Sequence, residues 1–119
     1  MSPQDRVHAA LLFDVYGPLL TEHQQEIWQL YYLEDWSLAE IGTEQGISRA
    51  AVHDSLERTQ RVLQDYEERL GLLAQHQRRQ ERLRTIMRLI AQLAQESVEV
   101  RALREAVAQL AEEEGLAGV

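Results

Sequence analysis

The stretch from Leu38 to Arg58, LAEIGTEQGISRAAVHDSLER, constrains the fold more than any other part of this sequence. Ser37, followed three residues later by Glu40, forms a capping box that satisfies the free amides at a helix start. Gly46 ends that helix, because glycine readily adopts the left-handed conformation of a C-terminal cap. Ser48 is a good cap for a second helix. The spacing therefore predicts two helices joined by a tight turn.

The apolar residues of this stretch support the same arrangement. Leu38 and Ile41 face one side of the first helix, and Gly42 offers a small surface for a close crossing. Val52 and Leu56 form the buried stripe of the second helix. This is the layout of a helix-turn-helix, residues 37–58, whose second helix can present its outer face to a groove. That outer face would carry Ser48, Arg49, Ala50, His53, Asp54 and Glu57.

Two more helices complete a four-helix domain over residues 1–72, and the second helix of the helix-turn-helix runs on beyond it. The first runs from Asp5 to Tyr16 and stops at Gly17-Pro18. Thr21 with Gln24 makes another capping box, which opens a second helix. The helix from Arg49 continues to Leu70, since no breaker intervenes before Gly71. We predict an all-α helix-turn-helix bundle whose core includes Leu11, Ile27, Leu38, Ile41, Val52 and Leu56.

A long C-terminal helical extension, residues 73–119, follows this domain. Its apolar residues are spaced as in a heptad seam, with a one-residue slip shortly after Ser97, which could cap a separate last helix. Such a seam must be covered, so we predict a homodimer, with an antiparallel hairpin folded back at Ser97 as the alternative. The tail from Glu112 to Val119 is expected to fray. The predicted dimerisation residues are Leu83, Ile86, Ile90, Leu93, Val100, Leu103, Val107 and Leu110.

Charge is distributed unevenly along the chain. Twelve basic residues, all arginine, stand against 20 acidic residues, for a net charge of -8, so the whole chain lacks a basic nucleic-acid footprint. Arginines cluster only after Gly71, at Arg78, Arg79, Arg82, Arg84 and Arg88. The residues that we predict to contact nucleic acid are Ser48, Arg49, His53, Arg58, Arg61, Arg78, Arg79 and Arg82.

Several classes of function find no support in the sequence. The four histidines are scattered, no Gly-rich phosphate loop or nucleophile elbow is present, and we expect no catalysis, metal or cofactor. The absence of cysteine, of a signal peptide and of an apolar span makes the cytoplasm the expected location. The aromatic residues Trp28, Tyr31, Tyr32 and Trp36 could stack on bases, but we interpret them as core packing because they coincide with an apolar face.

The stretch from Leu11 to Leu73 resembles the YlxM family of small bacterial proteins, through the segments FDVY, LLTEHQ, LYYLEDWSLAEI and SRAAVHDS. A more distant likeness is to the helix-turn-helix of sigma-factor region 4. The resemblance implies a nucleic-acid-binding regulator associated with the signal recognition particle pathway. Its implied partners are the particle's RNA and its GTPase protein.

The sequence departs from the family pattern SRQAVYDS at the recognition helix, where Ala50 and His53 replace Gln and Tyr. Gly42 also stands where Ala is usual. Alanine offers no hydrogen bond to a base edge, and Asp54 and Glu57 would repel phosphate. The leading hypothesis is therefore a regulator of protein targeting that contacts the particle's RNA or protein. The alternatives are a DNA-binding transcriptional regulator of the sigma region 4 type and a pure protein-interaction adaptor.

Overall fold

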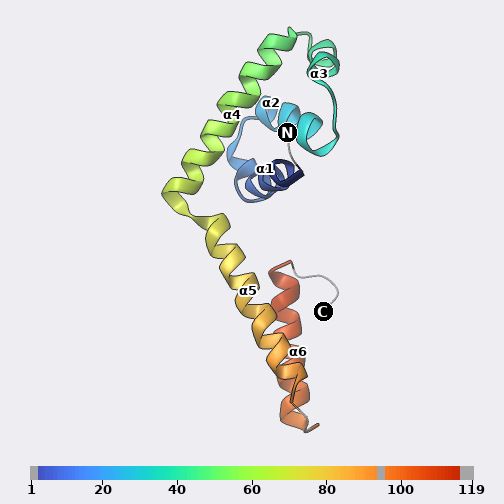
Figure 1. Ribbon diagram of the computed structural model, residues 1–119, viewed down its shortest axis with the longest axis vertical. Helices are drawn as coiled ribbons and strands as arrows, with labels where there is room; N and C mark the ends of the chain where they lie inside the picture. The colour runs from blue at the N-terminus through green and yellow to red at the C-terminus, as the bar shows by residue number, and fades with distance from the viewer. Residues whose placement is uncertain (1–2, 94–95, 116–119) are drawn as a thin grey trace. The chain divides into compact units, whose positions relative to one another are not determined.

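A computed structural model of the chain describes residues 3–93 and 96–115. All the regular elements in the described residues are helical (Figure 1), and none of them combines the length and the apolar character needed to cross a lipid bilayer. The chain forms two compact units, an N-terminal unit of residues 1–73 and a C-terminal unit of residues 74–119. The α-helices are α1 (Pro3–Tyr16), α2 (Glu22–Trp28), α3 (Leu38–Gln45), α4 (Arg49–Leu70), α5 (Leu72–Ala91) and α6 (Val98–Glu113).

The helix ends predicted from the caps at Thr21, Ser37, Gly46 and Ser48 are confirmed, whereas α1 begins at Pro3, two residues before the predicted Asp5. The Thr21–Gln24 and Ser37–Glu40 capping boxes are both complete, with each side chain bonded to the backbone amide of the other residue. Hydrogen bonding to the Ser37 amide and hydroxyl lowers the pKa of the Glu40 carboxyl. Gly46 ends α3 in the left-handed conformation, with φ of 69°. The Ser48 hydroxyl then accepts a hydrogen bond from the Ala51 amide and starts α4.

Two short segments depart from the predicted α-helices. Gly17–Leu19 forms a single 3-10 turn, η1, after α1. Gln29–Leu33 forms a π-helix, η2, which directly follows α2. Arg6 donates hydrogen bonds from Nη1 to the Tyr31 and Tyr32 carbonyls, and its Nη2 pairs with Asp35 at 2.6 Å. The arginine thus satisfies backbone carbonyls that the end of η2 leaves free.

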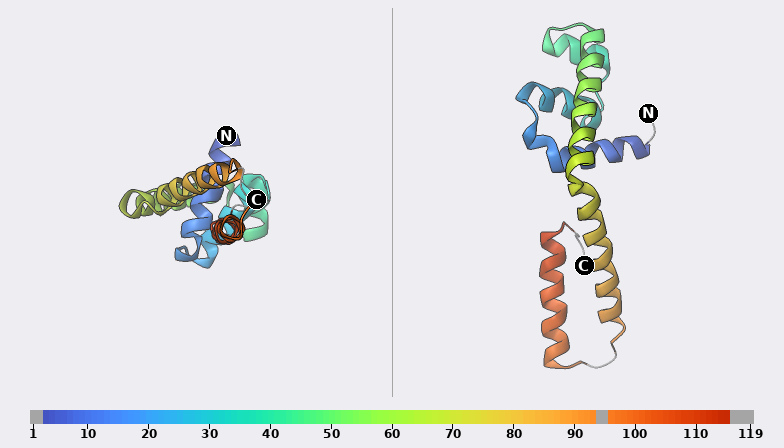
Figure 2. Two further views of the ribbon diagram at one scale, coloured as in Figure 1. Left: turned by 90° about the horizontal axis from the view of Figure 1, so that it is seen from below. Right: turned by 90° about the vertical axis from the view of Figure 1, so that its left-hand side faces the viewer.

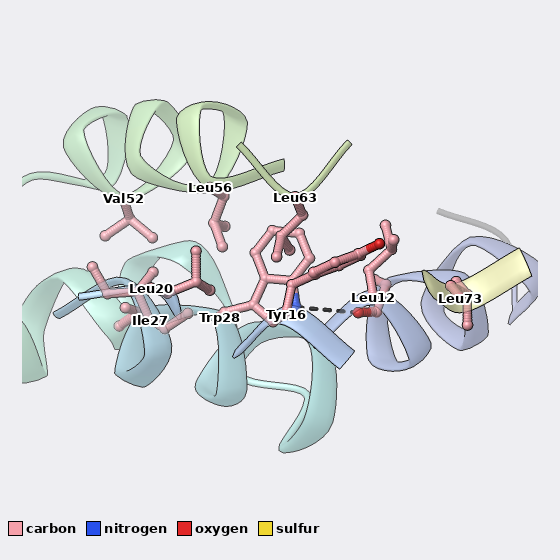
Figure 3. Packing of buried hydrophobic residues seen from close by; sticks show 11 residues of the cluster. Leu12, Tyr16, Leu20, Ile27, Trp28, Val52, Leu56, Leu63 and Leu73 are labelled. Atoms are coloured by element: carbon pink, nitrogen blue, oxygen red, sulfur yellow. Dashed lines mark hydrogen bonds between the residues drawn. The ribbon is translucent and has the colours of Figure 1, made fainter. Parts of the chain in front are cut away.

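The core of the N-terminal unit lies between α4 and the earlier helices (Figure 3). Ile27, Ile41, Val52 and Leu56 are buried as predicted. The prediction was wrong in detail for Leu11 and Leu38, which are half-buried at the edge of the core. Helix α1 instead buries Leu12, the residue next to Leu11. The buried cluster is Ala9, Leu12, Tyr16, Leu20, Ile27, Trp28, Ile41, Val52, Leu56, Leu63 and Leu73.

The turn between α3 and α4 depends on the small size of Gly42. A Cβ atom at this position would lie 2.8 Å from the Ile47 carbonyl oxygen and 3.4 Å from the Arg49 nitrogen. The Ile47 amide donates to the Gly42 carbonyl at 3.0 Å, which holds the turn closed. The close crossing predicted at Gly42 is therefore confirmed. The absence of a side chain at this position lets the start of α4 lie close to α3.

Tyr16 forms a buried polar junction at the end of α4. Its hydroxyl donates to Glu67 Oε1 at 2.5 Å and accepts from the Leu72 amide at 3.1 Å. Glu67 Oε1 also accepts from the Leu73 amide at 3.0 Å. Burial, followed by the hydrogen bond to Glu67, raises the pKa of the Tyr16 hydroxyl. Gly71 ends α4 with φ of 62°, and these side chains then satisfy the first amides of α5.

The C-terminal unit is a pair of antiparallel helices, α5 and α6, which lie side by side in both views (Figures 1 and 2). Ser97 caps α6 by accepting a hydrogen bond from the Val100 amide, as the sequence predicted for a separate last helix. The small apolar cluster between the helices consists of Leu83, Ile90 and Val107, with Met87 packed against them. Among the described residues, part of the predicted seam is thus buried within one chain, between the two helices of this hairpin.

The remaining seam residues are only partly covered by this hairpin. Val100 is half-buried, and Leu93 follows the end of α5 rather than extending it. The predicted fraying was wrong for Glu112 and Glu113, which lie in α6; residues 116–119 of that tail are outside the described part of the chain. The four exposed seam residues are Ile86, Leu93, Leu103 and Leu110.

Candidate nucleic-acid interface

The outer face of the first turns of α4 is open to solvent. The packing of Val52, Ser55 and Leu56 against the core sets the rotation of this helix. The opposite residues are thereby left outside, as expected for the second helix of a helix-turn-helix. The predicted outer-face residues Ser48, Arg49, Ala50, His53, Asp54 and Glu57 are all exposed.

A shallow hollow of about 450 Å³ lies where α3 and α4 begin. Leu38 of α3 forms one side, while Arg49, His53 and Asp54 contribute the polar groups of α4. Ala50 adds only a methyl group to the lining. The Ser48 oxygen already accepts the Ala51 amide, so its role in the structure is that of a helix cap. Arg49 and His53 are therefore the side chains in this hollow that can donate hydrogen bonds to a ligand.

Acidic groups surround His53. Its Nδ1 lies 3.8 Å from Asp54 Oδ1, and its Nε2 lies 3.7 Å from Glu57 Oε1. One potential ligand atom from each of these three exposed residues lies within 4.8 Å of the others. Exposed side chains one turn apart on a helix commonly group in this way, so the cluster is by itself no metal site. Its negative charge opposes phosphate binding at this part of the face.

Arginines lie further along α4. Arg58 and Arg61 are exposed and three residues apart, so they share one face of the helix. Arg61 borders a second hollow of about 350 Å³ together with Glu57, Gln60 and Gln64. Within the described part of the chain, neither these two arginines nor Arg49 is held in an ion pair. Their guanidinium groups are free to bind an anion.

The second group of predicted contacts lies on α5, in the C-terminal unit. Arg78, Arg79 and Arg82 are all exposed. Arg79 Nε lies 3.6 Å from Glu114 Oε1, and His76 Nδ1 lies 3.1 Å from Glu114 Oε2. The backbone carbonyl of Glu114 also accepts from the Gln80 side-chain amide at 2.9 Å. Glu114, at the end of α6, thus already neutralises part of the positive charge of α5.

The predicted contact residues therefore divide into two sets. The structure brings Ser48, Arg49 and His53 together at the start of α4, and it places Arg58 and Arg61 on one face of the same helix. The α5 arginines belong to the other unit. Sequence reasoning missed Glu114 as the partner of Arg79, because it treated the acidic run that begins at Glu112 as a frayed tail.

The aromatic residues belong to the core, as interpreted from the sequence. Trp28 is buried, and its Nε1 donates to the Ala9 carbonyl at 3.4 Å. Tyr31, Tyr32 and Trp36 are half-buried and pack against the same cluster. Burial raises the pKa of the Tyr32 hydroxyl. Trp28 therefore has no free face for a nucleobase.

Comparison with known proteins gives a consistent match. Residues 4–103 match a family described as "Putative helix-turn-helix protein, YlxM / p13 like". A UPF0122 protein of Symbiobacterium thermophilum is 59% identical over 76 residues, which cover 64% of this chain and 71% of that protein. One from Halalkalibacterium halodurans is 49% identical over 75 residues, covering 63% and 69%. A third, from Caldanaerobacter subterraneus, is 44% identical over 86 residues, covering 72% and 74%.

Proposed function

Because this chain belongs to the YlxM/p13-like UPF0122 family of helix-turn-helix proteins, we propose that it is a non-enzymatic regulator that binds structured RNA. The resemblance of Leu11–Leu73 to YlxM makes the RNA of the signal recognition particle the leading ligand. The particle's GTPase protein is the second partner that this resemblance implies. In this proposal the protein acts in the cytoplasm and modulates protein targeting.

The observation that carries the proposal is the exposed surface of α4 with its unpaired arginines. Arg49, Arg58 and Arg61 are distributed over more than three turns of one helix, and no ion pair within the described residues occupies them. Guanidinium groups bind phosphate oxygens in a bidentate manner, so arginines placed along a helix suit a nucleic-acid backbone. The core packing of Val52 and Leu56 keeps Arg58 and Arg61 on the outward side of α4. Arg49, nine residues before Arg58, projects from a different side of the exposed first turn.

The acidic neighbours of His53 favour RNA over sequence-specific DNA. A DNA reader inserts the first turns of this helix into the major groove, where Asp54 and Glu57 would approach phosphate. Ala50 can make no hydrogen bond to a base edge. A folded RNA can instead be recognised by its shape and backbone, through the arginines further along α4. The DNA-binding alternative of the sigma region 4 type therefore requires a docking mode that avoids these carboxylates.

The test is a binding titration with the particle's RNA, duplex DNA and the targeting GTPase, each at two salt concentrations. RNA affinity should fall steeply as salt rises, because phosphate contacts release counterions. Replacing Arg49, Arg58 and Arg61 by Gln should weaken RNA binding and reduce the salt slope by about one per lost phosphate contact. Arg69→Gln is the matched control on the same helix, since Arg69 already pairs with Asp65 at 3.1 Å.

The arginines of α5 are tested in a second variant, with Arg78, Arg79 and Arg82 replaced by Gln. Comparing the two triple variants shows which unit supplies the phosphate contacts. Unchanged RNA affinity after all six replacements would remove nucleic acid from the mechanism. Tight, salt-insensitive binding of the GTPase would then favour the adaptor alternative, and preferential binding of duplex DNA would favour the transcriptional regulator.

A further inference from the structure

The C-terminal unit leaves much of its apolar surface uncovered. Within its described residues, its apolar cluster comprises Leu83, Ile90 and Val107, with Met87 packed against them, and Ala111 is the one further buried apolar residue. A single pair of helices with so few buried residues gains little from hydrophobic burial. Five large apolar side chains remain exposed beside this cluster, with exposed fractions of 43% for Ile86, 55% for Leu89, 46% for Leu93, 46% for Leu103 and 46% for Leu110.

These five exposed residues share one face of the hairpin. In α5, Ile86 lies three residues after the inward-facing Leu83. Leu93 lies just beyond the end of α5, where its amide donates to the Ile90 carbonyl at 3.0 Å and keeps it beside this row. In α6, Leu110 likewise lies three residues after the inward-facing Val107. The exposed residues are therefore displaced in the same rotational sense around each helix axis.

Because α5 and α6 face each other and run in opposite directions (Figure 2), this displacement carries both exposed rows to the same side. Leu89 and Leu103 extend the two rows by helical spacing. Val98 is also exposed, but the same spacing places it on the opposite side of α6. We call the surface formed by Ile86, Leu89, Leu93, Leu103 and Leu110 the hairpin face. It is one apolar surface with a row from each helix.

We propose that the hairpin face is covered by the hairpin face of a second copy of this chain, so that two hairpins form a four-helix bundle. The bundle supplies each helix with two neighbours, which is the number its wide apolar stripe requires. The proposal retains a homodimer through the seam expected from the sequence, but each pair of helices is first closed within its own chain.

Charge explains why the occupant is another copy. Residues 72–91 carry five arginines and one glutamate, whereas residues 96–114 carry six glutamates and two arginines. The hairpin thus presents a basic helix beside an acidic helix. Such a surface is complementary to itself when one copy is turned so that basic faces acidic, as an isologous contact requires.

The charge pattern also selects the orientation of the dimer. A two-fold axis parallel to the helices places each α5 opposite the partner's α6, whereas an axis across the helices places α5 on α5 and α6 on α6. Like charges directly opposed are unfavourable, so the parallel axis is selected. In that arrangement the start of α5 lies against the end of the partner's α6.

One ion pair is expected where these ends meet. Arg82, Ile86 and Leu89 are spaced four and three residues apart, so exposed Arg82 continues the row of α5 toward the start of that helix. Glu113 follows Leu110 by three residues, and it continues the row of α6 toward its end. The two-fold axis therefore brings Arg82 of one copy near Glu113 of the partner subunit. This pair can be tested by exchanging the two charges.

The first experiment measures the mass of the full chain by sedimentation equilibrium at micromolar concentration, without nucleic acid. We expect a dimer, and Leu89→Asp should shift it to a monomer whose N-terminal unit remains folded. Leu19→Asp is the matched control, because Leu19 is a 58% exposed leucine of the N-terminal unit. A monomeric mass for the unmodified protein, or a dimer unaffected by Leu89→Asp, would overturn the proposal.

The second experiment tests the orientation. Arg82→Glu or Glu113→Arg alone should weaken dimerisation several-fold, because each places like charges opposite one another. Combining both changes should restore the dimer. If the double variant is weaker than either single variant, the arrangement of α5 opposite the partner's α6 is wrong. Both readouts are independent of RNA binding, so this inference and the proposed function can fail separately.

Discussion

The two units of this protein cover the apolar faces of their helices to unequal extents. The N-terminal unit surrounds a cluster of 11 residues with α1 to α4 (Figure 3), and Trp28, Ile41 and Leu63 are almost fully buried. The C-terminal unit holds a cluster of three residues between two helices and leaves five large apolar side chains exposed on one face. Both units leave large apolar side chains exposed, so the contrast between them lies in the size of the buried cluster that each one holds.

The largest effect is expected for Ile41→Asp in the N-terminal core. Ile41 has no exposed surface, so the substitution buries a carboxylate without a partner. The cost should match the whole stability of a small domain, about 5–15 kcal/mol, and unfold the N-terminal unit. Circular dichroism melting would measure this loss. A cooperative melt at the wild-type temperature would show that the core is placed wrongly.

A smaller effect is expected for Ile90→Ala in the C-terminal unit. Removing this side chain deletes one of the three residues of the apolar cluster, and the cost should be about 2 kcal/mol, at the low end for such truncations. Hydrogen exchange should accelerate in α6 while the amides of α4 stay protected. Equal acceleration in α4 would mean that the two units unfold together, which would remove the contrast between them.

Gly42→Ala tests how tightly the helix-turn-helix closes. The added methyl group would lie 2.8 Å from a backbone oxygen, which cannot rotate away as a side chain could. We expect a loss of about 1–3 kcal/mol in chemical denaturation. Glu44→Ala is the control, since Glu44 is exposed on the same helix. If both variants denature alike, the turn has room that the structure does not show.

The smallest effect is expected for Glu40→Gln, read through its pH dependence. The Ser37 hydrogen bonds lower the pKa of Glu40, so its ionised form stabilises the fold above the unfolded-state pKa. That contribution is lost as the pH falls through the lower folded-state pKa. Glutamine can still accept the amide but does not titrate. The wild type should therefore lose more stability than the variant on acidification, and parallel pH curves would contradict this account.

The sequence predicted the features of this fold that depend on neighbouring residues. Thr21, Ser37, Ser48 and Ser97 all cap the helices expected of them, because a cap is decided within four residues. The π-helix after α2 was not predicted, since it depends on packing and on Arg6, which lies more than 20 residues away. For the same reason the sequence could not choose between half-buried Leu11 and buried Leu12.

The sequence predicted which face of α4 is exposed, but it did not predict which arginines are already paired with acidic residues. The exposed outer face of α4 followed from the buried positions of Val52 and Leu56. The engagement of Arg79 by Glu114 was missed, since it joins the start of α5 to the end of α6. Contacts between residues far apart in sequence carry no local signal, and they decide which arginines are free.

The Tyr16 junction has a consequence for the order in which the chain can fold. The partners of its hydroxyl lie 51 and 56 residues later in the sequence, at Glu67 and Leu72. During synthesis from the N-terminus, Tyr16 emerges well before either partner exists. Burying the hydroxyl without them would cost about 1–3 kcal/mol. The N-terminal unit should therefore reach its final packing only once the whole of α4 has left the ribosome.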